Sequence, residues 1–277
     1  MDPIKIMING IPGNMATNVA SLALNDNRFC VIPYSLTGPE IQEDTHKIGS
    51  VGFNLIRPNQ KERLIQKLIK DESPFISVDY THPSAVNSNA DFYCQYNLPF
   101  VMGTTGGDRE RLLKTVTTST TSAVISPNMA KQIVGFQAMM EYAAEHFKDL
   151  FKGYTLEIKE SHQKGKADTS GTAKAMIGYF NKLGTPVEAS DIIMIREPEI
   201  QKDELGVPEA FIKGHAWHTY TLRSDDETVR FQFTHNVNGR DIYTKGTLDA
   251  VEYLSKRIGD GSQGKVYSMI DVLKGVP

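Results

Sequence analysis

Cysteine, long apolar runs and surplus positive charge are all scarce in this chain. Only two of the 277 residues are cysteines, Cys30 and Cys94, and neither has a cysteine or histidine at metal-ligand spacing. We therefore expect two buried, reduced thiols in an intracellular protein, with neither a disulfide framework nor a metal site. Because no apolar run approaches the roughly 20 residues that cross a bilayer, the sequence also argues against a membrane span.

The charge and composition indicate an ordinary globular protein. A net charge of −3 argues against a nucleic-acid binder that relies on a broad basic field, and leaves open only a small local basic patch. A chain of 277 residues is long enough for one large domain or two modest ones. The first residues already follow a strand pattern, so no signal or transit segment is expected ahead of them. The expected location is the cytoplasm, or the plastid stroma for a processed plant chain.

The first half of the chain alternates strand-like and helix-like segments. Alternation of this kind predicts a Rossmann-like α/β domain, with a parallel sheet and helices on both faces. The expected strands are 4–9, 29–34, 51–56, 75–79, 98–102 and 122–125, and the expected helices are 14–25, 59–71, 84–95 and 107–118. We assign residues 1–128 to a dinucleotide-binding domain.

The second half changes to an α+β pattern with a mostly antiparallel sheet. Long helices are expected over 130–150 and 172–183, and strands over 154–159, 192–195, 215–223 and 228–235. The last two strands form a hairpin through Ser224–Glu227. We assign residues 129–246 to a substrate-binding and oligomerisation domain. The C-terminal residues 247–277, with a helix over 247–258, can pack on either domain.

The first strand leads into a glycine-bearing turn that suits a dinucleotide. Small residues in the segment Asn9–Ala16 let the backbone approach a pyrophosphate at a helix N-terminus, although an ordinary strand-to-helix turn would look similar. The candidate cofactor-binding residues are Gly10, Gly13, Asn14 and Met15. No carboxylate ends the second strand, so the sequence favours NADPH over NADH, with Ser35 and Thr37 as donors to a 2′-phosphate.

A second glycine-bearing loop, Gly103–Gly107, follows the strand over 98–102. Ligands bind at the carboxyl ends of parallel strands, so this loop is a candidate cofactor contact, with a plain glycine-rich connection as the alternative. The segment Asp79–Pro83 ends another strand at the same expected edge, where we interpret His82 as a structural or cofactor-rim residue.

The segment over residues 160–176 carries the most specific chemistry. It places His162, Lys164, Lys166 and Asp168 ahead of a Ser170–Gly171–Thr172 turn that opens a helix. Cationic side chains beside free N–H groups at a helix N-terminus suit binding and protonating a small anion. The segment therefore predicts a site for a small anion, with a proton donor beside it.

Nearly the full chain resembles dihydrodipicolinate reductase of lysine biosynthesis. The resemblance depends on the turn at 10–15, on GTTG at 103–106, on SPNM at 126–129 and on the pattern His162…Lys166-Ala167-Asp168…Ser170-Gly171-Thr172. It implies NAD(P)H-dependent reduction of 4-hydroxytetrahydrodipicolinate to tetrahydrodipicolinate with loss of water. It also implies a homo-oligomer, a dimer or a tetramer, and two domains that close substrate against nicotinamide.

The resemblance also implies roles for individual residues. His162 and Lys166 match the catalytic pair, with the lysine as proton donor, and Ser170, Gly171 and Thr172 match the turn that binds a substrate carboxylate. Lys164 is a further candidate for binding the dicarboxylate. The remaining candidate cofactor residues are Gly103, Thr104, Thr105, Ser126, Asn128 and Met129. Between His162 and Lys166 this chain has glutamine, lysine and glycine where many bacterial members have histidine, arginine and histidine. In this respect it is more like the plant-type branch.

Two rival functions stay open. Another two-domain NAD(P)-dependent oxidoreductase, such as a semialdehyde dehydrogenase, needs a cysteine nucleophile near a histidine, and both cysteines sit inside expected core elements. A non-catalytic NADP-binding sensor would keep the fold and show no turnover.

Overall fold

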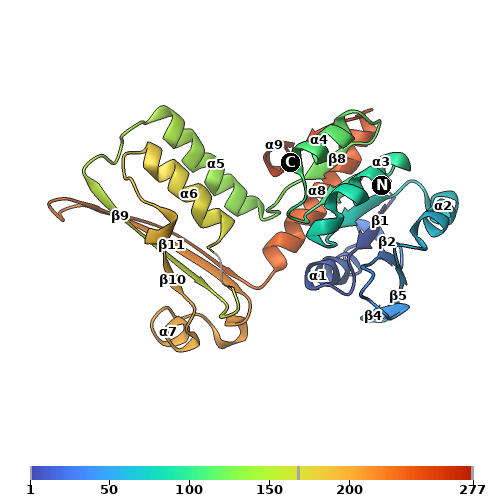
Figure 1. Cartoon of the computed structure of the whole chain (residues 1–277), viewed down its shortest axis with the longest axis horizontal. Helices are drawn as coiled ribbons and strands as arrows, with labels where there is room; N and C mark the ends of the chain where they lie inside the picture. The colour runs from blue at the N-terminus through green and yellow to red at the C-terminus, as the bar shows by residue number, and fades with distance from the viewer. Residues whose placement is uncertain (1, 167–168, 276–277) are drawn as a thin grey trace. The chain divides into compact units, whose positions relative to one another are not determined.

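The computed structural model describes residues 2–166 and 169–275 (Figure 1). The chain divides into two compact units. Unit 1 comprises Met1–Lys131 and Asp241–Pro277, and unit 2 comprises Gln132–Arg240. The C-terminal segment thus belongs to the same unit as the N-terminal one. Among the described residues, no helix combines the length and apolar character that crossing a bilayer requires.

Unit 1 is built on a six-stranded sheet in which every neighbouring pair is parallel. Its order is β13-β8-β7-β6-β1-β2. The strands are β1 (Ile4–Asn9), β2 (Phe29–Val31), β6 (Ile76–Asp79), β7 (Phe100–Met102), β8 (Ala123–Ile125) and β13 (Val266–Tyr267). All residues of β6 and β7 are buried, as expected for central strands covered on both faces. The predicted parallel α/β fold is confirmed.

Helices cover both faces of this sheet. Met7 packs in one core cluster with residues of α2 (Lys61–Glu72), α3 (Val86–Gln95) and α4 (Arg109–Thr117). The neighbouring Ile6 and Ile8 are also fully buried but point to the opposite face, because side chains alternate along a strand. There α1 (Asn14–Ala23) packs against α8 (Asp241–Gly259), which also contacts β6, β7 and β8. The short α9 (Met269–Gly275) follows β13.

The expectation of one continuous strand over 29–34 is wrong. Pro33 has no N–H to donate to a ladder, and the chain turns there into a second sheet. That sheet has the order β3-β5-β4, with β3 (Tyr34–Leu36), β4 (Thr45–Ile48) and β5 (Val51–Ile56). Strand 51–56 therefore lies outside the parallel sheet, and β4 has no counterpart in the prediction.

The two cysteines are free thiols in different surroundings. Cys94 is partly buried, whereas Cys30 is exposed, so the expectation of two buried thiols is wrong for Cys30. It lies on β2, the edge strand of the six-stranded sheet, where the covering layers end.

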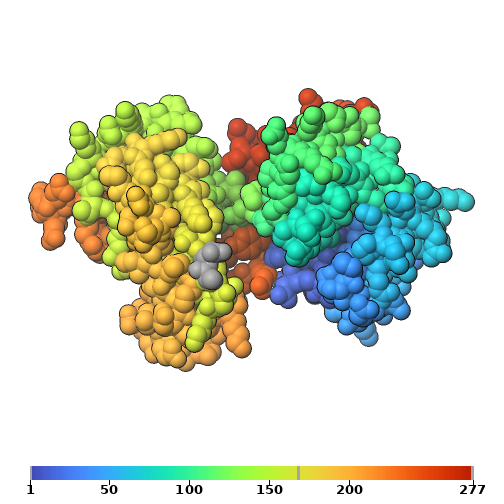
Figure 2. All heavy atoms as spheres, viewed as in Figure 1, coloured from blue at the N-terminus to red at the C-terminus, as the bar shows by residue number. Residues whose placement is uncertain are grey.

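Unit 2 packs helices on a four-stranded sheet of order β10-β9-β11-β12. Its elements are α5 (Lys131–His146), β9 (Tyr154–His162), α6 (Gly171–Lys182), β10 (Ile193–Ile195), α7 (Pro198–Asp203), β11 (His215–Ser224) and β12 (Arg230–Asn238). Only β10 runs parallel to its neighbour, so the predicted mostly antiparallel sheet is confirmed. α5 and α6 lie side by side (Figure 1 and Figure 2), and their apolar residues pack on Ile158, Tyr220 and Leu222 of the sheet.

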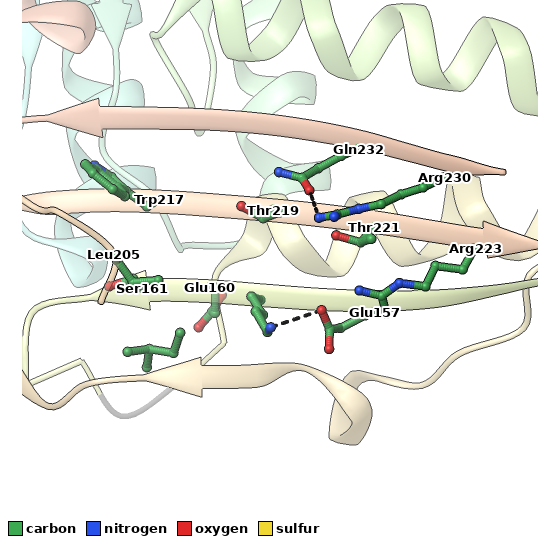
Figure 3. Close-up of a pocket in the computed structure, with 12 residues that line it drawn as sticks. Glu157, Glu160, Ser161, Leu205, Trp217, Thr219, Thr221, Arg223, Arg230 and Gln232 are labelled. Carbon is green, nitrogen blue, oxygen red and sulfur yellow. Dashed lines mark hydrogen bonds and ion pairs between the residues drawn. The ribbon is translucent and has the colours of Figure 1, made fainter. Parts of the chain in front are cut away.

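The opposite face of the unit 2 sheet carries polar side chains around a shallow cavity of about 250 Å³ (Figure 3). Lys159 Nζ lies 3.0 Å from Glu157 Oε1 there, and Arg230 donates to Gln232. Trp217 lies at one end of the cavity, where its Nε1 donates to Asn238. Side-chain alternation explains the contrast between the two faces, since Glu157 and Lys159 flank the buried Ile158.

Candidate active site

The turn between β1 and α1 requires glycine at two positions. Gly10 has φ +104°, and a Cβ there would lie 2.2 Å from the carbonyl oxygen of Tyr80. At Gly13 a Cβ would lie 2.8 Å from the carbonyl oxygen of Gly10. Gly13 is also the N-cap of α1 and offers the helix no side-chain cap. The first-turn N–H groups of α1, which include those of Asn14 and Met15, therefore suit a pyrophosphate.

Asp79, at the carboxyl end of β6, organises the neighbouring loops. Its fully buried carboxylate accepts hydrogen bonds from Tyr93 Oη at 2.7 Å, Asn89 Nδ2 at 3.0 Å and Thr104 Oγ1 at 2.6 Å. Asn9 joins the network by donating from Nδ2 to Tyr93 Oη at 3.1 Å. The predicted Thr104 is thus a buried residue that fixes its loop to β6, and Asp79 supports the loop without being exposed.

The predicted 2′-phosphate donors have partners within the chain. Ser35 is fully buried, and its Oγ accepts the Ile11 N–H at 3.1 Å. Thr37 Oγ1 donates to the Ile11 carbonyl at 3.0 Å. Both hydroxyls therefore hold the glycine-bearing turn in place.

The other predicted cofactor residues lie at the carboxyl ends of β7 and β8. Gly103 faces the Tyr80 ring, which a Cβ would approach to 2.4 Å, and Thr105 is exposed. After β8, Ser126 Oγ donates to the Asn128 carbonyl at 2.7 Å. Met129 is buried. Because β1, β7 and β8 are parallel strands of one sheet, the turn at Gly10 and both loops share its carboxyl edge.

The predicted substrate segment begins at the end of β9. His162 is its last residue and only 6% exposed, Lys164 is exposed, and Lys166 is partly buried. The Lys166 N–H donates to the Gln163 carbonyl at 3.0 Å, which closes a tight turn. Ala167 and Asp168 of the predicted motif lie outside the described residues.

Ser170, in the turn that was predicted to open a helix, is the N-cap of α6. Its Oγ accepts the Ala173 N–H at 3.0 Å, and it lies 2.8 Å from His218 Nε2. Because the hydroxyl already accepts one hydrogen bond, its proton can be directed to the imidazole nitrogen. The backbone N–H groups of Gly171 and Thr172 in the first helical turn stay available to a carboxylate.

Three titratable residues form a row across the sheet on the face that α5 and α6 cover. The register pairs Glu160 of β9 with His218 of β11, and His218 with His235 of β12. Glu160 is fully buried, and the two imidazole rings stack with centroids 4.7 Å apart. Glu160 Oε2 lies 3.9 Å from His162 Nε2. Glu160, His218 and His235 were not predicted as site residues. The sequence did offer a signal for Glu160, because it lies two residues before the predicted His162 and therefore on the same face of the strand.

The surroundings hold Glu160 ionised and the histidines neutral. Burial opposes ionisation of Glu160, but the Ser170 N–H and the Arg196 guanidinium outweigh it and lower its pKa. Burial lowers the pKa of His162 to about 4, despite the opposing charge of Glu160. It likewise lowers the pKa of His218 to about 2 and that of His235 to about 4.

These depressed values make the stability of the protein depend on pH. An unfolded histidine takes up its proton near pH 6.5, whereas the three folded histidines stay neutral to about pH 4 or below. Between these limits the unfolded state binds more protons, so the free energy of unfolding falls as the pH falls. We expect a lower urea midpoint at pH 5 than at pH 7. His235→Phe keeps an aromatic ring between Phe136 and Tyr220 and should reduce this drop. An undiminished drop would count against the contribution of His235.

One group of described residues has donor atoms close enough for a metal ion. The donor atoms of Glu160, His162 and His218 lie within 4.8 Å of one another. Glu160 already accepts hydrogen bonds from Arg196 and Ser170, and His218 Nε2 is paired with the Ser170 hydroxyl. We therefore interpret this group as a hydrogen-bonded network. That the site holds no metal stays a prediction.

Comparison with known proteins assigns both parts of the chain to one kind of enzyme. Residues 4–129 match the family described as dihydrodipicolinate reductase, N-terminus, and residues 133–273 match its C-terminus. The chain is 46% identical to the chloroplastic 4-hydroxy-tetrahydrodipicolinate reductase 2 of Arabidopsis thaliana, over 98% of this chain and 77% of that protein. A probable chloroplastic reductase 2 of Oryza sativa is 44% identical, over 97% of this chain and 82% of that protein.

The fold has a counterpart among solved structures. A dipicolinate-bound dihydrodipicolinate reductase from Paenisporosarcina sp. TG-14 aligns with a TM-score of 0.67 over 97% of this chain and 98% of that chain. At 18% sequence identity, this likeness concerns the fold alone.

Proposed function

The chain belongs to the dihydrodipicolinate reductase family, and on that premise we propose that it reduces 4-hydroxytetrahydrodipicolinate to tetrahydrodipicolinate, with loss of water, in lysine biosynthesis. The observation that carries the proposal is the segment from His162 to Thr172. It combines a lysine held in a turn with a helix N-terminus whose capping hydroxyl is already satisfied. A small dicarboxylate that must be protonated suits this combination.

The residues of unit 2 handle the dicarboxylate and the proton. The Ser170 hydroxyl is engaged by Ala173 and His218, so it is not free to bind the substrate. The N–H groups of Gly171 and Thr172 bind one carboxylate instead. Lys166 supplies the proton, and Lys164 adds positive charge for the second carboxylate. His162 is neutral near pH 7, so its imidazole orients the substrate by a hydrogen bond rather than by charge.

The residues of unit 1 hold the pyridine nucleotide, which supplies the hydride when bound. The uncapped N-terminus of α1 beside Gly10 and Gly13 receives the pyrophosphate. Thr104, fixed by Asp79, and Asn128 hold the loops at the same sheet edge. Gly103, Thr105, Ser126 and Met129 shape these loops.

We expect NADPH to be the preferred cofactor. No carboxylate follows β2 in the segment Ile32–Thr37, so nothing there repels a 2′-phosphate. Ser35 and Thr37 are buried and already bond to Ile11, so the expected preference rests on the missing carboxylate rather than on these two hydroxyls. Steady-state assays should give a higher kcat/KM for NADPH than for NADH. A clear preference for NADH would overturn this assignment.

The test of the proposed function is oxidation of NAD(P)H at 340 nm in the presence of freshly generated 4-hydroxytetrahydrodipicolinate. A sensor protein would bind NADPH in a calorimetric titration and show no turnover. Steady turnover that depends on the substrate therefore separates the two functions. Gel filtration with light scattering tests the proposed homo-oligomer, a dimer or a tetramer. The plant relatives are named chloroplastic, which supports the plastid stroma as the compartment of a plant chain.

A further inference from the structure

Arg196 directly follows β10 and reaches back to the start of the substrate segment. Its Nε donates to the Lys166 carbonyl at 2.9 Å, and its Nη1 donates to the Glu160 carbonyl at 3.3 Å. Its Nη2 bonds to Glu160 Oε1. The parallel register that pairs Ile195 with Ser161 brings the arginine to this end of β9. One guanidinium therefore joins Glu160 and Lys166, which lie 36 and 30 positions before Arg196 in the chain.

Glu160 extends this connection to the helix that binds the carboxylate. Its Oε2 accepts the Ser170 N–H at 3.0 Å, while its Oε1 is held by Arg196. His218 holds the other side of Ser170, because its Nε2 lies 2.8 Å from the hydroxyl. Ser170 is thus fixed through both its backbone and its side chain.

The surroundings make the ion pair sensitive to change. The Glu160 side chain is 0% exposed and that of Arg196 is 13% exposed. Removing the partner of a buried carboxylate is strongly destabilising, and it disturbs the groups that the carboxylate holds in place. A lysine would retain the charge but offers a single nitrogen, which cannot reach both the Lys166 carbonyl and the Glu160 carboxylate as the planar fork does.

We propose that Arg196 is a positioning residue for the reaction: it fixes the proton donor Lys166 and, through Glu160, the carboxylate-binding turn at Ser170 relative to each other. The inference rests on the proposed function, which assigns the roles of Lys166 and of the turn. In this role Arg196 acts through Lys166 and Glu160, to which its guanidinium is bonded, and not by contact with substrate or cofactor. Arg196 keeps the distance between the proton donor and the bound carboxylate fixed, and the geometry of the reacting groups depends on that distance.

Arg196→Lys is the decisive variant, with Arg223→Lys as its matched control. Arg223 is an exposed arginine on β11 of the same sheet. We expect Arg196→Lys to lower kcat/KM for the substrate by about 100-fold, as displacement of reacting groups by about 1 Å does. The KM for NADPH should stay within about twofold, since unit 1 binds the cofactor. Arg223→Lys should match the wild type in both constants.

Two further measurements separate positioning from plain stabilisation. Arg196→Ala should recover part of its activity with millimolar guanidinium, and none with methylammonium, because only the planar fork spans both acceptors. Arg196→Lys should also weaken binding of the dicarboxylate probe pyridine-2,6-dicarboxylate by about 10-fold or more in calorimetry, with the thermal midpoint close to that of wild type. Wild-type affinity and kcat/KM in Arg196→Lys would overturn the proposal. The proposal would also be overturned if guanidinium restored no activity to Arg196→Ala and the loss of activity in the variants only matched their unfolded fraction.

Turnover by the wild-type protein, measured first, keeps this test separate from that of the proposed function. If the wild-type protein does not turn over the substrate, the proposed function fails. If turnover is present and Arg196→Lys behaves like Arg223→Lys, only the positioning role fails.

Discussion

Lys166→Ala is expected to lower kcat by about 10²- to 10⁴-fold, the range that a positioned general acid contributes. Hydride addition leaves electron density on the substrate that must be protonated, and alanine has no proton to give. The backbone of Lys166 should stay in place, because its N–H bonds to Gln163 and its carbonyl bonds to Arg196. The loss should therefore appear in kcat, with little change in the thermal midpoint.

Lys159→Ala is the matched control for this variant. Lys159 lies on the same strand, β9, but on the open polar face, where it pairs with Glu157. An exposed ion pair of this kind contributes about 1 kcal/mol or less, so wild-type kcat is expected. Wild-type kcat in Lys166→Ala as well would remove Lys166 from the mechanism.

His162→Ala should also reduce turnover, and comparison of the two variants separates their roles. Since burial lowers the pKa of His162 to about 4, the side chain is a neutral imidazole at pH 7 and not the imidazolium that would act as a general acid. We therefore expect the variant to raise the KM for the substrate as well as lower kcat, whereas Lys166→Ala acts mainly on kcat.

Gly10→Ala is expected to reduce the free energy of unfolding of unit 1 by about 2–6 kcal/mol. The φ of +104° strains any residue with a Cβ, at a cost of about 1–3 kcal/mol. The added carbon would also lie 2.2 Å from the Tyr80 carbonyl oxygen, and overpacking against backbone costs about 1–3 kcal/mol more. Denaturant unfolding of wild type and variant measures the difference, and NADPH affinity should fall with it.

The control for Gly10→Ala is Gly52→Ala in β5 of the same unit. No heavy atom lies within 4 Å of a Cβ at Gly52, and its φ is not positive. This variant should therefore leave the stability unchanged or raise it slightly. Equal stabilities for the two variants would contradict the strain assigned to Gly10.

The fold could be predicted from local patterns, and the errors have local causes. Alternating helices and buried strands fixed the parallel sheet of unit 1, since each signal lies within a few residues. The split at Pro33 was missed because a strand ending and a strand changing sheets look alike in sequence. Strand β4 (Thr45–Ile48) has no apolar alternation, and only its pairing with β5 makes it a strand.

The hairpin of unit 2 shows why part of the candidate site was missed. A turn limited to Ser224–Glu227 would place His218 opposite Phe233. In the structure the turn also takes up Thr228 and Val229, so that His218 faces His235. A shift of two residues keeps every side chain on its own face, which is why the predicted core was unaffected.

The residues proposed to touch ligands were named from sequence, whereas those that support them were not. His162, Lys166 and Ser170 share one short segment, and their order carries a recognisable chemistry. Arg196 is 30 residues beyond Lys166 and meets it only because β10 pairs with β9. No periodicity or motif in one sequence reports such a pairing.

The division of unit 1 into two segments affects how the protein is made. Unit 2 is complete in the nascent chain once Arg240 has emerged, whereas unit 1 still lacks α8 and the edge strand β13. Until then one face of α1 has no helix to pack against. Domains generally fold as units during synthesis. We therefore expect the inserted unit to reach its native state first on the ribosome, while the N-terminal segment waits for the residues from Asp241 onward.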